Sequence, residues 1–168
     1  DTLESVCADH GVDIANVNCP GQTVISGAKD ALQSTIEALQ AADIKRIIPL
    51  DVDGAFHSRL MKPAGVRFGE MLAQVDLREP AVPVMQNVVG GEVHDPAEIR
   101  TNLQRQISGS VLWESCVRAM LAKEPDLLIE LGPGKVLSGF MRRIDRSATV
   151  CNVSTVDDLD RVAERLTD

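Results

Sequence analysis

The sequence predicts an α/β protein, because short apolar strands alternate with amphipathic helices along most of its 168 residues. Within residues 28–42, Leu32, Ile36 and Leu39 recur at the spacing that places them on one face of a helix. Residues 127–131 (LLIEL) form a short apolar run before a glycine turn, as expected for a strand that is buried on both faces. Such strands need helices on either side, and the sequence supplies them in alternation.

Residues 1–51 are predicted to contain a helix over 2–10, strands over 12–17 and 22–26, a helix over 28–42 and a strand over 46–50. The break Asn18-Cys19-Pro20-Gly21 suits a tight connection between antiparallel strands. This order lacks only the leading strand of a ferredoxin-like βαββαβ unit. We therefore expect residues 1–51 to form a partial ferredoxin-like small lobe, with the leading strand just before Asp1.

Residues 52–168 show a different order of predicted helices and strands. The predicted elements are a helix over 58–75, a strand over 82–88, helices over 95–107 and 111–122, a strand over 127–131, a helix ending at 144, a strand over 149–153 and a helix over 156–166. Apolar strands alternating with helices indicate a parallel sheet covered on both faces. The boundary between the two lobes is expected near residues 51–54.

The composition argues against several classes of partner. The formal net charge of -8 is unfavourable for binding nucleic acid or an anionic membrane surface. No apolar run approaches the length of a membrane-spanning helix. The four cysteines, Cys7, Cys19, Cys116 and Cys151, show neither zinc-ligand spacing nor a dense disulfide framework. We therefore expect a cytoplasmic protein that holds no metal and binds neither nucleic acid nor membrane.

His57 is the first candidate for chemistry, because it stands between a predicted strand and the mouth of a predicted helix. An imidazole at this place can act as the general base for a hydroxyl nucleophile. It can also serve simply as a cap for the helix start, and the spacing alone favours that second role. His10 and His94 lie in polar surroundings and are expected at the surface.

The glycine-rich turn Gly132-Pro133-Gly134 follows a strand and precedes a helix, an arrangement that can hold an anion. It matches neither a Walker A loop nor G-x-G-x-x-G, and a tight connection required by packing explains it equally well. Glu130 is unusual on an apolar strand and predicts a polar partner near this turn. Trp113, at the start of a helix, is expected in the core.

Six segments, in this order and spacing, closely resemble the malonyl-CoA:acyl carrier protein transacylases of fatty acid synthesis. They resemble the acyltransferase domains of polyketide synthases more loosely. The segments are Asn16-Val17-Asn18-Cys19-Pro20-Gly21-Gln22, Gly54-Ala55-Phe56-His57-Ser58-Arg59-Leu60-Met61, Pro83-Val84-Met85-Gln86-Asn87-Val88, Arg105-Gln106-Ile107, Val111-Leu112-Trp113 and Ile129-Glu130-Leu131-Gly132-Pro133-Gly134-Lys135-Val136-Leu137.

The resemblance implies a serine–histidine acyl transfer. In the family, a serine in a G-H-S-x-G elbow accepts malonyl from coenzyme A and passes it to the phosphopantetheine thiol of acyl carrier protein. His57 matches the histidine that deprotonates the serine and later the thiol. Asn87 and Gln106 match positions whose main-chain carbonyls can fix the imidazole tautomer, in place of the carboxylate of a standard triad.

The same resemblance implies the substrate and its partners. Asn16 and Asn18 match polar positions that line the cleft between the lobes, and Phe56 matches the bulky residue of malonyl-preferring members. A bulky side chain there would crowd an α-methyl branch on the substrate. We expect malonyl-CoA as substrate, acyl carrier protein as partner, no cofactor, and a monomeric complete enzyme.

Two expected parts of the site do not occur in the sequence. No G-H-S-x-G is present, and nothing replaces the arginine with which the family binds the malonyl carboxylate. The resemblance therefore implies the C-terminal part of the enzyme, with residues 52–168 belonging to an α/β-hydrolase-like lobe, and a chain that is inactive alone. The alternatives are an acyltransferase domain of a polyketide synthase and a non-catalytic ferredoxin-like binding module.

Overall fold

The computed structural model describes residues 2–167, and its mixture of helices and two-stranded sheets confirms the predicted α/β class. The first elements are α1 (Thr2–Asp9), β1 (Asp13–Cys19), β2 (Gln22–Ser26) and α2 (Lys29–Ala41), as predicted within a few residues. β1 and β2 pair antiparallel across the turn at Pro20 and Gly21, where Gly21 takes a φ of 73°. This left-handed conformation favours glycine and explains the tight turn.

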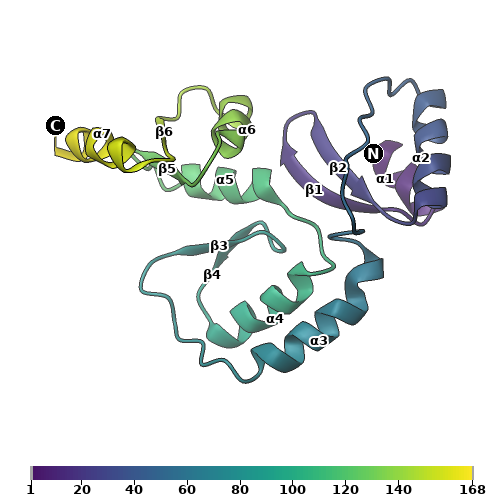
Figure 1. Cartoon of the computed structure of the whole chain (residues 1–168), viewed down its shortest axis with the longest axis horizontal. Coiled ribbons are helices and arrows are strands. Elements are labelled where there is room, and N and C mark those ends of the chain that lie inside the picture. Colours follow the sequence, from purple (N-terminus) through teal and green to yellow (C-terminus); the bar gives the residue numbers. More distant parts are fainter. Residues whose placement is uncertain (1, 168) are drawn as a thin grey trace.

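Apolar side chains from α1, β1 and α2 form the core of this part. The buried members are Cys7, Val12, Ala15, Cys19 and Leu39. Figure 1 shows α1 and α2 lying beside the β1–β2 hairpin, which positions β1 between these helices and the remainder of the chain.

The strand predicted over residues 46–50 does not form. Within residues 2–167 this segment pairs with no strand, and Ile48 and Leu50 are 64% and 59% exposed. The short apolar run with two isoleucines indicates β-propensity, but a strand exists only where a neighbour accepts and donates ladder hydrogen bonds. Pro49 removes one ladder donor from the run as well. The leading strand expected before Asp1 lies outside the described residues.

The helix predicted over 58–75 is shorter and begins differently. A single 3₁₀ turn, η1 (Arg59–Met61), leads into α3 (Lys62–Leu72). Arg100 closes the C-terminal end of α3, because its guanidinium donates hydrogen bonds to the main-chain carbonyls of Leu72 and Val75. These bonds satisfy carbonyls at and just beyond the end of α3, where no further helical turn supplies donors.

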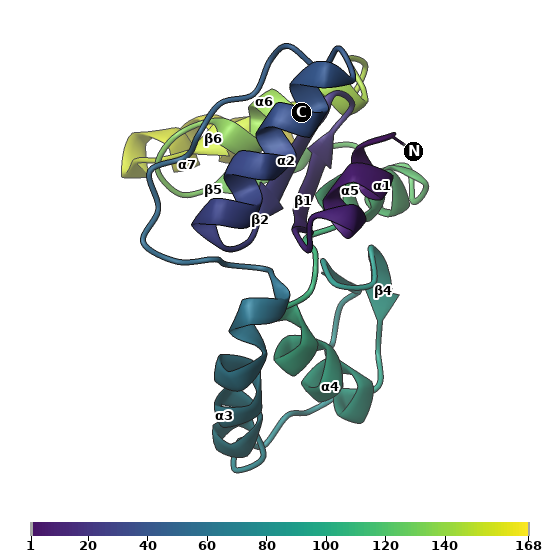
Figure 2. The same ribbon diagram turned by 90° about the vertical axis from the view of Figure 1, so that its right-hand side faces the viewer.

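α3 packs against α4 (Pro96–Gln106) beneath a short hairpin made of β3 (Val84–Gln86) and β4 (Gly91–Val93). Asn102 is 1% exposed and donates from Nδ2 to Oε1 of Gln86 at 2.9 Å, which ties α4 to β3. Figure 2 shows this helix pair set apart from the β1–β2 hairpin.

The expected parallel sheet is wrong for this hairpin. β3 is shorter than the predicted strand, β4 was not predicted, and the two pair antiparallel. Gly90, with a φ of 70°, reverses the chain after β3. The next three residues then run antiparallel beside β3 as β4.

The last part contains α5 (Trp113–Leu121), β5 (Leu128–Leu131), α6 (Val136–Ile144), β6 (Val150–Val153) and α7 (Val156–Thr167). β5 and β6 pair in parallel, as predicted for alternating strands and helices. The expected burial of β5 on both faces is wrong, since Ile129 and Leu131 are exposed. The polar partner expected for Glu130 is confirmed, since its carboxylate accepts hydrogen bonds from the first turn of α6. None of the helices over residues 2–167 combines the length and apolar character required to span a membrane.

Candidate active site

His57 occupies a strained turn between the extended segment after α2 and the 3₁₀ turn η1. Its φ of 57° lies in the left-handed region, which costs a non-glycine residue about 1–3 kcal/mol unless its surroundings enforce it. Ser58 enforces it. The Ser58 hydroxyl is fully buried, donates to the Ala55 carbonyl at 2.6 Å and accepts from the Leu60 N–H at 3.3 Å. Ser58 is therefore the cap of η1, so the alternative role of helix cap for His57 is wrong.

The His57 ring is oriented by a main-chain carbonyl. Its Nδ1 lies 3.0 Å from the carbonyl oxygen of Gln106, the last residue of α4. A carbonyl oxygen only accepts hydrogen bonds, so this contact forms when Nδ1 carries the proton. In the neutral ring Nε2 then holds the lone pair. The arrangement leaves Nε2 ready to accept a proton from another group.

The Gln106 carbonyl is itself held by a tight loop that follows α4. Gln106 donates from Nε2 to the carbonyls of Gly109 and Ser110, at 3.1 and 3.4 Å. A Cβ at Gly109 would lie 2.8 Å from Cγ2 of Val88 and 2.9 Å from the carbonyl oxygen of Arg105. Any larger residue would force this loop to shift, which explains the glycine.

β1 fixes the other end of the loop. Ser110 donates from Oγ to the Ile14 carbonyl at 2.6 Å. Val111 donates to the Ala15 carbonyl and accepts from the Val17 N–H, each at 2.8 Å. The loop that presents the Gln106 carbonyl is therefore registered on β1, more than 90 residues earlier in the chain.

A charged pair attaches the His57 turn to the same strand. The Asp13 carboxylate accepts from the main-chain N–H of Arg59 at 2.7 Å, and from its guanidinium Nε at 3.0 Å and Nη2 at 2.7 Å. Partial burial acts to raise the pKa of Asp13, but the hydrogen bonds and charge of Arg59 outweigh it and leave that pKa lowered. The same contact raises the pKa of Arg59. Sequence reasoning missed this pair, because no local pattern links residues 46 positions apart.

The carbonyls of Asn87 and Gln106 have different hydrogen-bond partners. The Asn87 carbonyl accepts a hydrogen bond from the Leu112 N–H at 2.8 Å, so it braces the segment after the loop. Of the two carbonyls predicted to orient His57, the structure brings that of Gln106 to the ring.

The predicted substrate-binding residues lie on β1 and in the His57 turn. Asn16 and Asn18 are half-buried on β1, and Asn16 forms a bridge to Val111 of the loop. Phe56 is 54% exposed, and its ring lies over Gly54, where an added Cβ would be 3.2 Å from Cζ. Phe56 directly precedes His57 in the chain, and its ring is accessible to a small molecule.

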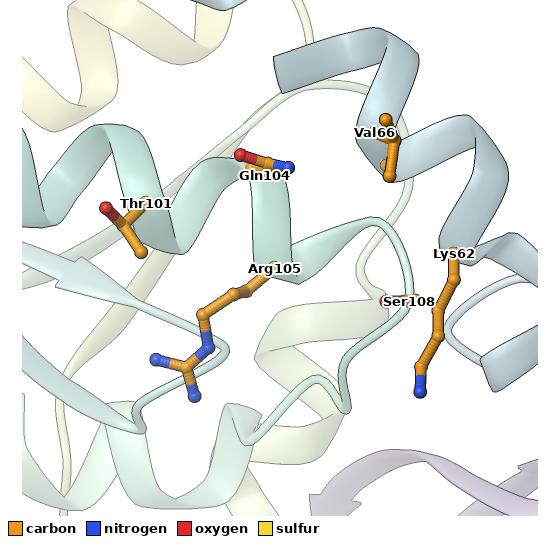
Figure 3. A pocket seen from close by; sticks show the side chains of 7 residues that line it. Lys62, Val66, Thr101, Gln104, Arg105 and Ser108 are labelled. Atoms are coloured by element: carbon orange, nitrogen blue, oxygen red, sulfur yellow. The ribbon is translucent and has the colours of Figure 1, made fainter.

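A separate cavity of about 380 Å³ lies between α3 and α4 (Figure 3). It is lined by Lys62, Gly65, Val66, Thr101, Gln104, Arg105 and Ser108. Figure 3 shows the Arg105 side chain extending away from Lys62, and its Nη1 donates to Oδ1 of Asn102, also on α4, at 3.1 Å. Within residues 2–167, no group of three or more His, Cys, Asp and Glu side chains is arranged to hold a metal ion.

Comparison with known proteins identifies the class. Residues 2–160 match the profile of the acyl transferase domain, so the chain belongs to the acyl transferase domain family. It is 37% identical over 155 residues to the malonyl CoA-acyl carrier protein transacylase of Bacillus subtilis, covering 92% of this chain and 49% of the relative.

Two solved structures show the same fold. An acyl carrier protein S-malonyltransferase from Vibrio cholerae superposes with a TM-score of 0.91 at 38% identity, covering 96% of this chain and 54% of that one. A malonyl-transacylase in complex with its type II PKS acyl-carrier protein gives 0.92 at 32% identity, covering 98% and 54%. The chain thus spans about half the length of the relatives it matches.

Proposed function

We propose that this chain supplies the histidine-bearing part of a malonyl-CoA:acyl carrier protein transacylase, with His57 as the general base. The observation that carries the proposal is the 3.0 Å contact between Nδ1 of His57 and the Gln106 carbonyl, in a chain of the acyl transferase domain family. It supports a ring that is held in one tautomer and presents Nε2, as a serine–histidine mechanism requires.

The chemistry proceeds in two transfers. Nε2 of His57 takes the proton of a serine hydroxyl as the serine oxygen attacks the malonyl thioester, and the Gln106 carbonyl dipole stabilises the imidazolium. The carbon–sulfur bond breaks, and the imidazolium returns the proton to the coenzyme A thiolate. Nε2 then takes the proton of the phosphopantetheine thiol, which attacks the serine ester. The malonyl group leaves on acyl carrier protein, and the serine recovers its proton.

The substrate-binding roles come from the resemblance, and the exposure of these side chains is compatible with them. Phe56, which directly precedes His57, is proposed to contact C2 of the malonyl group, and Asn16 and Asn18 to line the cleft. The residues of the ferredoxin-like small lobe and of the hydrolase-like lobe would form the two walls of that cleft. Asn87 is proposed to act indirectly, because its main-chain carbonyl holds the segment at Leu112. The reaction needs no cofactor, and we place it in cytoplasmic fatty acid synthesis.

A fusion protein tests the proposal. The part of the Bacillus subtilis relative that this chain does not cover, where the resemblance places the G-H-S-x-G serine, is joined before residue 1. We expect the fusion to form a malonyl adduct on that serine and to transfer malonyl to acyl carrier protein. Carrier proteins of fatty acid and of polyketide synthesis are both offered, since the partner in one solved relative is of the PKS type.

Two controls make the result decisive. The Bacillus subtilis part alone reports any activity that does not require this chain, and the complete relative reports the activity of a native pairing. A folded fusion that takes up no malonyl from malonyl-CoA would overturn the proposed function.

A further inference from the structure

We propose that Asp13 is a positioning residue for His57, acting through Arg59. The proposal deepens the proposed function and rests on it, because positioning matters only if the imidazole works as a base. The residue does not touch the ring. Its effect is to fix the turn that carries the ring at a set distance from the Gln106 carbonyl.

Several hydrogen bonds are concentrated on the Asp13 carboxylate. Asp13 accepts from the main-chain N–H of Arg59 as well as from two guanidinium nitrogens, at distances of 2.7 to 3.0 Å. The main-chain bond fixes the peptide two residues after His57. The paired guanidinium bonds fix the direction of the side chain, because the fork of arginine matches a carboxylate in geometry.

Both partners of the imidazole–carbonyl contact are held by hydrogen bonds to the same strand, β1. Asp13 begins β1 and holds the His57 turn. The next residues of β1, Ile14 and Ala15, accept the hydrogen bonds that hold the loop after Gln106. In Figures 1 and 2 the start of α3 lies below the β1–β2 hairpin, as these bonds require. One strand therefore sets the distance between Nδ1 and the carbonyl oxygen from both sides.

The effect of Asp13 on the His57 turn can be distinguished from an effect on the stability of the whole chain. The Asp13–Arg59 pair is partly exposed, with side-chain exposures of 24% for Asp13 and 51% for Arg59. Exposed pairs contribute little to the overall free energy of unfolding. The molecule offers a matched pair on α5, Glu114 and Arg118, with exposures of 19% and 55% and a bond of 2.6 Å from Nη2 to Oε1. Removing the charge of Asp13 or that of Glu114 should change the free energy of unfolding by a similar amount. Of these two residues, Asp13 alone is hydrogen-bonded to the turn that carries His57.

The experiment reads the His57 tautomer directly in the ¹⁵N-labelled chain of 168 residues, by nuclear magnetic resonance at a pH where the imidazole is neutral. In the parent the Nδ1–H form should dominate. In Asp13→Asn the ratio of Nδ1–H to Nε2–H should fall about three- to tenfold, since the imidazole–carbonyl hydrogen bond is weakened. Arg59→Lys, which keeps the main-chain bond but loses the fork, should give a smaller fall. Glu114→Gln should leave the ratio unchanged.

The amide spectrum of each variant reports whether the fold survives away from the turn. An unchanged tautomer ratio in a folded Asp13→Asn variant overturns the proposal, and so does an equal change in Glu114→Gln. Because the ratio is read without any serine or substrate, these outcomes do not depend on transferase activity. Failure of the proposed function would instead appear in the fusion protein.

Discussion

Replacement of Glu130 by Gln should destabilise the protein at neutral pH but not in acid. The Glu130 carboxylate, at the end of β5, accepts hydrogen bonds from the N–H groups of Leu137 and Ser138, at 3.0 and 2.9 Å. It also accepts one from the Ser138 hydroxyl. These groups lie in the first turn of α6, where the helix leaves its N–H groups without intrahelical partners and favours negative charge.

The magnitude follows from these contacts. Hydrogen bonds to a charged acceptor contribute about 1 kcal/mol more than neutral ones, and the half-exposed position of Glu130 reduces that difference by solvent screening. The amide of Gln keeps part of the cap, so we expect a loss of about 1 kcal/mol in the free energy of unfolding, within the range for helix caps. For a chain of this length that corresponds to a fall in Tm of about 2–4 °C.

The pH dependence has a definite sign. Burial acts to raise the pKa of Glu130, but the bonds from Ser138 and Leu137 outweigh it and lower that pKa below its ordinary value. A lowered pKa in the folded state stabilises the protein above the unfolded pKa of about 4.3. This contribution is lost as the pH falls through the lowered folded value.

Thermal unfolding followed by circular dichroism at pH 7 and at about pH 3 measures both effects. Glu37→Gln is the matched control, because Glu37 is exposed on α2 and accepts a bond from Gln33 at 2.9 Å. Equal losses for the two variants at pH 7, or a Glu130→Gln deficit that persists undiminished in acid, would refute the reasoning.

Two further predictions concern the reaction. The 168-residue chain alone should form no malonyl adduct and transfer no malonyl to acyl carrier protein, because it contains no G-H-S-x-G; a stoichiometric adduct in its mass spectrum would contradict this. In the fusion protein, Phe56→Ser should raise the preference for methylmalonyl-CoA over malonyl-CoA by about tens of fold, the effect of steric discrimination over one methyl group. The ratio of the two kcat/KM values checks it, and an unmoved ratio would make Phe56 a packing residue.

The sequence predicted the elements that are stabilised by residues close to one another in the chain. The turn at Pro20 and Gly21 and the apolar spacing of α2 are local signals, and both were confirmed. Residues 46–50 show the limit of such signals, since their strand pattern says nothing about whether a pairing partner lies beside them. β4 was missed because Gly91–Val93 is too short to show a period of two.

The candidate site likewise combines a residue with a local sequence signal and contacts between residues far apart in the chain. His57 was found from its place between a strand-like segment and a helix, together with the resemblance to a known family. The Gln106 carbonyl was expected from the resemblance alone, and the Asp13–Arg59 pair was not predicted; the two contacts connect residues 49 and 46 positions apart. The carbonyl carries no side-chain signature at all, and Asp13 resembles any polar residue at the start of a strand. Only the folded chain shows that β1 holds both.

The measurement that tests the central claim most directly is the rate of malonyl transfer by the fusion protein carrying His57→Ala. General-base assistance typically contributes about 10²–10⁴-fold, so the account predicts a fall of that size in kcat, with an unchanged circular dichroism spectrum. A folded His57→Ala variant that transfers malonyl at close to the parent rate would contradict the account, and would remove His57 from the catalytic machinery.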